Sequence, residues 1–88
     1  MSDAAKHREI CEQLNQIYKS KNSDYGNSFS KQFEEYGLVS SAIRIEDKFL
    51  RFKNLIKNEA QVKDETVEDT LLDLANYAIL TVMELRKE

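Results

Sequence analysis

The chain has 88 residues and a formal net charge of −3, with 33% charged and 41% hydrophobic residues. This length makes one small domain, residues 1–88, and its interspersed charges lack the basic surface of a nucleic-acid-binding protein. No apolar run approaches the roughly 20 residues of a membrane span, and the N-terminus lacks an apolar leader. The single cysteine excludes an internal disulfide. We therefore expect a cytoplasmic protein, in the host cytoplasm if the chain is viral.

Residues 3–20 are predicted to form the first amphipathic helix, because Ile10, Leu14 and Ile17 recur at helical spacing. Ser2 or Asp3 is expected to cap its N-terminus. The segment KNSDYGNSF, residues 21–29, then interrupts the helical pattern with several turn-forming residues around one aromatic side chain. It is either a plain connector or a loop that binds a ligand.

The stretch NSFSKQFEEYG is predicted to form a short helix, capped by Asn27 or Ser28 and ended by Gly37. Residues 39–58 are predicted to form a long helix with two stripes. The buried stripe is expected to contain Ala42, Ile45, Phe49, Phe52 and Ile56.

The second stripe of this helix carries the cations Arg44, Lys48 and Arg51. It is either a solvated face, partly paired by Asp47, or a surface that binds phosphate through charged donors.

The last helix is predicted to start at Asp64 or Thr66 and is apolar around most of its circumference. We therefore expect it to be central in the fold, or shared between subunits of a homodimer or larger oligomer. Asp69, Asp73 and Asn76 line up on one side of it. A carboxylate beside so much apolar surface needs a partner, either the cationic stripe or a hard metal ion such as Mg²⁺.

Three blocks, YKSKNSDYGNSF, IRIEDKFLRFKNL and DETVEDTLLDLANYAIL, span residues 18–80 and together resemble the nucleotide modification associated domain 1 family of phages and bacteria. That family looks like a compact relative of the all-α, MazG-like nucleoside triphosphate pyrophosphohydrolases. The resemblance implies an all-α fold. Helices of this length joined by short connections usually pack antiparallel, so we expect a small antiparallel bundle of three longer helices and one short helix, and the apolar surface around the last helix favours an oligomer.

The MazG-like enzymes hold magnesium through four carboxylates on two helices. The resemblance places Asp69 and Asp73 on the second acidic helix, and Asp47 is the remaining candidate metal ligand. The preceding helix departs from the enzyme pattern, because Lys48 and Arg51 stand where paired glutamates are expected. The resemblance therefore implies nucleotide binding more strongly than hydrolysis.

Two hypotheses of function follow, and a third is purely structural. In the first, the protein binds a phosphorylated nucleotide, either to sequester a nucleotide signal used in host defence or to serve nucleotide modification. Given the resemblance, we interpret the loop at residues 21–29 as a lid over the ligand. The residues expected to bind the nucleotide are Lys21, Asp24, Tyr25, Asn27, Arg44, Lys48, Arg51, Asp73 and Asn76.

The alternative is a magnesium-dependent nucleoside triphosphate pyrophosphohydrolase, with Asp47, Asp69 and Asp73 as metal ligands and no catalytic residue assigned. The third option is a structural helical oligomer without a ligand.

Overall fold

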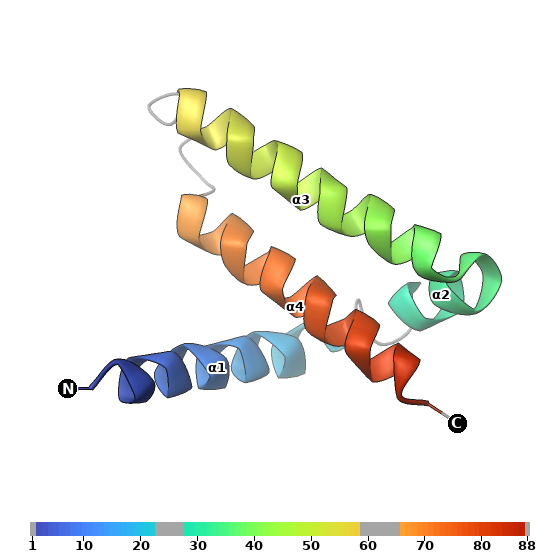
Figure 1. Cartoon of the computed structure of the whole chain (residues 1–88), viewed down its shortest axis with the longest axis horizontal. Coiled ribbons are helices and arrows are strands. Elements are labelled where there is room, and N and C mark those ends of the chain that lie inside the picture. The colour runs from blue at the N-terminus through green and yellow to red at the C-terminus, as the bar shows by residue number, and fades with distance from the viewer. Residues whose placement is uncertain (1, 23–27, 59–65, 88) are drawn as a thin grey trace.

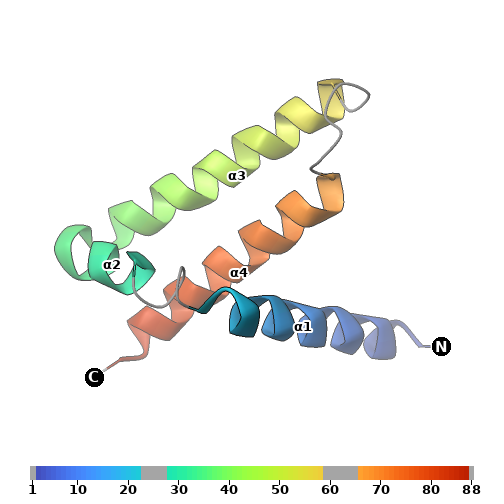
Figure 2. The same cartoon turned by 180° about the vertical axis from the view of Figure 1, so that it is seen from behind.

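The computed structural model describes residues 2–22, 28–58 and 66–87. This part of the chain forms α1 (Asp3–Ser20), α2 (Ser30–Tyr36), α3 (Leu38–Asn58) and α4 (Val67–Leu85). α3 and α4 lie side by side and antiparallel, while α1 crosses α4 obliquely, so α4 is the central helix (Figure 1). Figure 2 shows the same arrangement from behind, with the N-terminal half of α1 diverging from α4. The predicted all-α fold is confirmed.

Side-chain caps fix where α1 and α4 begin. Ser2 Oγ accepts a hydrogen bond from the Ala5 amide at 3.2 Å, as predicted for α1. At α4, Thr66 Oγ1 accepts from the Asp69 amide at 3.0 Å and the Asp69 carboxylate accepts from the Thr66 amide at 3.4 Å. This reciprocal capping box satisfies two otherwise unpaired amides. None of the helices within the described ranges is both long and apolar enough to span a membrane.

The short helix α2 starts and ends differently from the other helices. The residue before it is Phe29, which has no side-chain oxygen, so the expected cap by Ser28 is wrong, and Asn27 lies outside the described residues. At the other end Gly37 adopts φ 69° and ψ −150°, and its amide donates to the Phe33 carbonyl at 2.8 Å. This backbone region is open to glycine alone, which explains why the chain turns sharply there into α3.

A network of hydrogen bonds links the N-terminus of α2 to the C-terminal end of α4. Ser30 Oγ donates to Glu84 Oε1, and Lys87 Nζ donates to the same oxygen at 2.8 Å. The bonds from Lys87 and Ser30 lower the pKa of the Glu84 carboxyl below its ordinary value, because both stabilise the charged form. The network holds α2 against α4.

The core of a single chain is small. Phe29 and Leu80 are buried against the partly buried rings of Tyr18, Phe33 and Tyr77. Elsewhere Leu14, Leu55 and Leu72 are buried. In α1, Leu14 is the buried residue of a helix whose other side chains are mostly exposed, so this chain alone gives α1 little packing energy.

The predicted buried stripe of α3 is only half correct. Ile45 and Phe52 are half-buried, but Ala42, Phe49 and Ile56 are exposed. The face of α3 that packs on α4 is rotated toward the cationic stripe. It buries Leu55 on the same side as Arg44 and Lys48, and α4 places a carboxylate and an aromatic ring against these two cations.

Candidate functional site

Asp73 on α4 faces two lysines from different helices. Its Oδ2 lies 3.3 Å from Lys48 Nζ of α3, and its Oδ1 lies 3.8 Å from Lys21 Nζ at the end of α1. The Asp73 side chain is 22% exposed, so the group is partly open to water. We call Lys21, Lys48 and Asp73 the Asp73 cluster. Of the two partners expected for Asp73, the structure shows the lysine.

Arg44 lies one helical turn before Lys48 on α3, and an aromatic pair supports it. The Phe29 and Tyr77 rings are stacked with centroids 6.0 Å apart. The Arg44 guanidinium carbon lies 5.4 Å from the Phe29 centroid and 5.6 Å from the Tyr77 centroid. A guanidinium over aromatic faces is attracted by their negative electrostatic potential.

Residues before and within α2 fix the orientation of Arg44. Its Nε and Nη2 donate to Gln32 Oε1 at 2.9 and 2.6 Å, and Nη2 also donates to Ser28 Oγ at 3.3 Å. The Nη1 donors have no hydrogen-bond partner among the residues that the structure describes. These described residues therefore hold the guanidinium in place through Nε, Nη2 and its planar face.

The antiparallel packing of α3 and α4 explains why these groups meet. Arg44 and Lys48 are four residues apart on α3, and Asp73 and Tyr77 are four residues apart on α4, so each pair shares one helix face. Lys48 faces Asp73 and Arg44 faces Tyr77, as two successive contacts between the helices.

Among the described residues, cations outnumber carboxylates in the Asp73 cluster. One carboxylate faces two ammonium groups there, whereas Arg44, one turn before Lys48 on α3, lines the same hollow as the Asp47 carboxylate. Lysine and arginine donate strong charge-assisted hydrogen bonds to phosphate oxygens. Excess positive charge, partial exposure and a fixed guanidinium are the chemical requirements of an anion site.

Asn76, expected to contact the nucleotide, lies elsewhere. Its side chain is 3% exposed, and Nδ2 donates to the Leu14 carbonyl of α1 at 3.2 Å. The amide is already used to join α4 to α1.

The three expected metal ligands are separated by their own contacts. Asp73 is engaged by the two lysines, and Asp69 completes the capping box of α4. Asp47 lines a hollow of about 400 Å³ between α2 and α3, together with Tyr36 and Ile43. Within residues 2–22, 28–58 and 66–87, no three or more His, Cys, Asp or Glu side chains lie close enough to share a metal ion. The described carboxylates therefore do not fit a magnesium site of the expected type.

The remaining predicted residues are placed as follows. Arg51 is exposed on α3, beyond Lys48, and has an interaction partner of its own. Asp24, Tyr25 and Asn27 lie outside the described residues, so their predicted ligand contacts stay predictions.

Sequence reasoning missed the groups that hold Arg44. Tyr77 carried a usable signal, because it follows Asp73 by four residues and must share its face. The sequence carried no such signal for Gln32, since its contact with Arg44 depends on how α2 folds back against α3.

Comparison with known protein families shows what this chain is similar to. The family model described as nucleotide modification associated domain 1 matches residues 21–85, which include Lys21, Arg44, Lys48 and Asp73. Neither the curated proteins nor the solved structures contain a significant match to this chain. Because the matched region covers most of its length, the chain belongs to the nucleotide modification associated domain 1 family.

Proposed function

We propose that the protein binds a phosphorylated nucleotide where the Asp73 cluster meets Arg44, and that it holds this nucleotide without hydrolysing it. The observation that carries the proposal is the sharing of one carboxylate, Asp73, between Lys21 and Lys48. The carboxylate positions both ammonium groups but neutralises only one of them. Membership of a family associated with nucleotide modification supports a nucleotide as the anion.

Each group has a distinct task in this proposal. Lys48 and Lys21 donate to phosphate oxygens, and Asp73 keeps them oriented before the ligand arrives. Arg44 presents a planar guanidinium, whose geometry matches two phosphate oxygens at once. The loop residues Asp24, Tyr25 and Asn27 are proposed to contact the base or the sugar.

Two features favour binding over hydrolysis. A divalent cation at Asp73 would have to displace two ammonium groups, which the like charges oppose. The Asp69 carboxylate already serves the helix cap, where its Oδ2 accepts a hydrogen bond from the Thr66 amide. A protein that only holds the nucleotide suits sequestration of a nucleotide signal, or its delivery to a modifying enzyme.

Isothermal titration calorimetry against nucleoside mono-, di- and triphosphates, with magnesium and with EDTA, tests the proposal. We expect binding that EDTA does not weaken, with the nucleotide recovered intact. Lys48→Ala should weaken binding at least tenfold, since a charge-assisted hydrogen bond contributes about 1.5–3 kcal/mol. Lys53→Ala is the matched control: Lys53 lies on the same helix but over the Phe49 ring, 5.4 Å from its centroid. It should change the affinity less than twofold.

Three results would contradict this function. Release of pyrophosphate or phosphate that stops in Asp73→Ala would identify a hydrolase. Equal affinities of Lys48→Ala and Lys53→Ala would remove the Asp73 cluster from the site. No heat with any nucleotide would leave the cluster as an ion pair that only joins the helices.

A further inference from the structure

The hollow between α2 and α3 adjoins the Asp73 cluster but takes no part in it. Its volume of about 400 Å³ lies within the range of small-molecule sites, roughly 300–1,000 Å³. Tyr36, Val39 and Ile43 give it an apolar wall, and these side chains are between 55% and 64% exposed. An aromatic ring beside two branched aliphatic side chains offers a flat heteroaromatic ring a surface on which to stack.

Arg44 connects this hollow to the candidate phosphate site. It lines the hollow, and its guanidinium carbon also lies 5.6 Å from the centroid of the Tyr77 ring on α4. Asp47 and Lys48 are consecutive, so their side chains leave α3 about 100° apart. Asp47 lines the hollow, whereas Lys48 pairs with Asp73 on α4. A ligand with a ring at one end and phosphates at the other can therefore contact both sides of α3.

Two polar side chains set the hydrogen-bonding character of the hollow. Asp47 has no hydrogen-bond or ion-pair partner within the described ranges, so both of its carboxylate oxygens can accept from a ligand. Gln32 Oε1 already accepts from Nε and Nη2 of Arg44, at 2.9 and 2.6 Å. The Gln32 amide therefore serves a ligand through its nitrogen, as a donor. The hollow thus offers a pair of acceptors from α3 and one donor from α2.

Among the common bases, guanine matches this set. Its Watson–Crick edge carries the acceptor O6 beside two adjacent donors, N1–H and the 2-amino group, and two adjacent donors match the two oxygens of one carboxylate. Adenine and cytosine present a single amino group beside a ring nitrogen, whose lone pair a carboxylate repels. Uracil places its single N–H between two carbonyl groups, which a carboxylate also repels.

We propose that the nucleotide is a guanine nucleotide whose base occupies the hollow between α2 and α3. Asp47 accepts hydrogen bonds from N1–H and the 2-amino group, and Gln32 Nε2 donates to O6. This inference rests on the proposed nucleotide binding, because Lys48 and Lys21 hold the phosphates in both. It adds a group that selects the base to the groups that bind the phosphates.

Isothermal titration calorimetry with nucleoside diphosphates tests the choice of base. We expect the dissociation constant of GDP to be lower than those of ADP, CDP and UDP by about a factor of ten or more, as for other bidentate contacts to a base. Inosine diphosphate, which lacks the 2-amino group, should fall between GDP and ADP.

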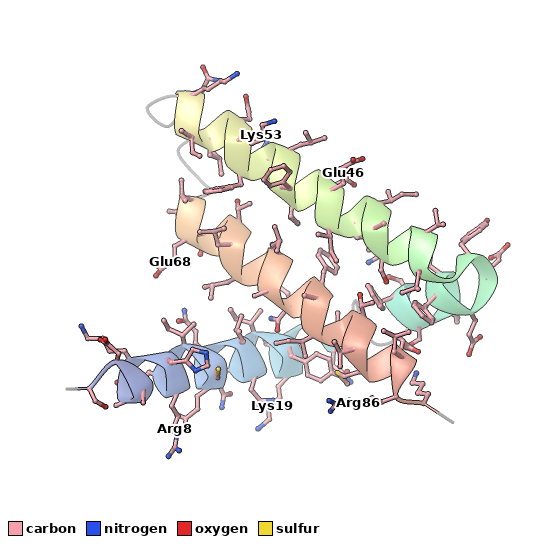
Figure 3. The ribbon with its side chains drawn as sticks, in the orientation of Figure 1. Arg8, Lys19, Glu46, Lys53, Glu68 and Arg86 are labelled. Atoms are coloured by element: carbon pink, nitrogen blue, oxygen red, sulfur yellow. The ribbon has the colours of Figure 1, made fainter. Side chains whose placement is uncertain are left out.

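Asp47→Asn tests the group that selects the base. The variant should weaken GDP binding about tenfold and strengthen the binding of xanthosine diphosphate, because an amide donates to the 2-oxo group of xanthine and a carboxylate repels it. Glu46→Gln is the matched control. Figure 3 shows Glu46, the carboxylate next to Asp47, projecting from α3 on the side away from α4. This control should change each affinity less than twofold, and both variants should keep the wild-type far-UV circular dichroism.

The outcomes separate the guanine assignment from the proposed function. If GDP, ADP, CDP and UDP bind equally well and Lys48→Ala weakens all four, the protein binds nucleotides without reading the base, and the guanine assignment is wrong. A preference for GDP that survives Asp47→Asn would remove Asp47 from the base contact and overturn the inference. No heat with any diphosphate would contradict both proposals.

Discussion

Asn76→Ala separates a structural role of this residue from a role in ligand binding. The side chain is 3% exposed and its amide donates to the Leu14 carbonyl at 3.2 Å. Loss of one buried neutral hydrogen bond costs about 0.5–1.5 kcal/mol, and the emptied space adds about 1 kcal/mol. We therefore expect a loss of about 2 kcal/mol. For a chain of this length the melting temperature should fall by roughly 8–16 °C.

Urea unfolding followed by far-UV circular dichroism measures this loss. Protein concentration must be equal in all samples, because the stability of any self-associating protein depends on it. Asn54→Ala is the matched control: Asn54 is exposed, and its side-chain oxygen accepts a surface bond from Asn58 at 3.1 Å. The control should stay within about 0.5 kcal/mol of the wild type.

The reasoning about Asn76 has a clear refutation. If Asn76→Ala keeps wild-type stability but loses nucleotide affinity tenfold or more, the residue contacts the ligand, as expected from its alignment with Asp73. If stability falls and affinity at low temperature is unchanged, Asn76 only joins α1 to α4.

Three further predictions concern the helix ends. Thr66→Ala should cost about 1 kcal/mol in urea unfolding and Thr66→Ser almost nothing, since serine retains the capping oxygen; equal losses would exclude the cap. Gly37→Ala should cost about 1–3 kcal/mol although a Cβ there meets nothing within 4 Å, because the strain lies in the backbone at φ 69°; an unchanged urea midpoint would contradict this. Hydrogen bonds from Lys87 and Ser30 lower the pKa of Glu84, so the charged carboxylate stabilises the fold above the ordinary carboxyl pKa, and this stability is lost as the pH falls through the lowered pKa. Glu84→Gln should therefore lose less stability on acidification than the wild type. Parallel plots of the urea midpoint against pH for the two proteins would exclude the effect.

The sequence determined the helices and most of their ends by itself. Helical periodicity placed α1 at residues 3–20, and the local chemistry of Ser2, Thr66 and Gly37 marked boundaries that the structure confirms. These features depend on neighbours within one turn, so they can be read from a single segment. The cap of α2 expected at Ser28 was wrong because Ser28 and Phe29 already adopt π-helical backbone that leads into α2.

Only the tertiary structure decided how the helices are rotated against one another. Periodicity favoured Ala42, Phe49 and Ile56 as the buried side of α3, but the packed side contains Arg44 and Lys48. The apolar stripe and the cationic stripe are both long enough to pack, and the choice depends on what α4 offers across the interface. Leu55, on the same side of α3 as Arg44 and Lys48, is 1% exposed, and Lys48 pairs with Asp73 there, so packing on this side assembles the candidate site.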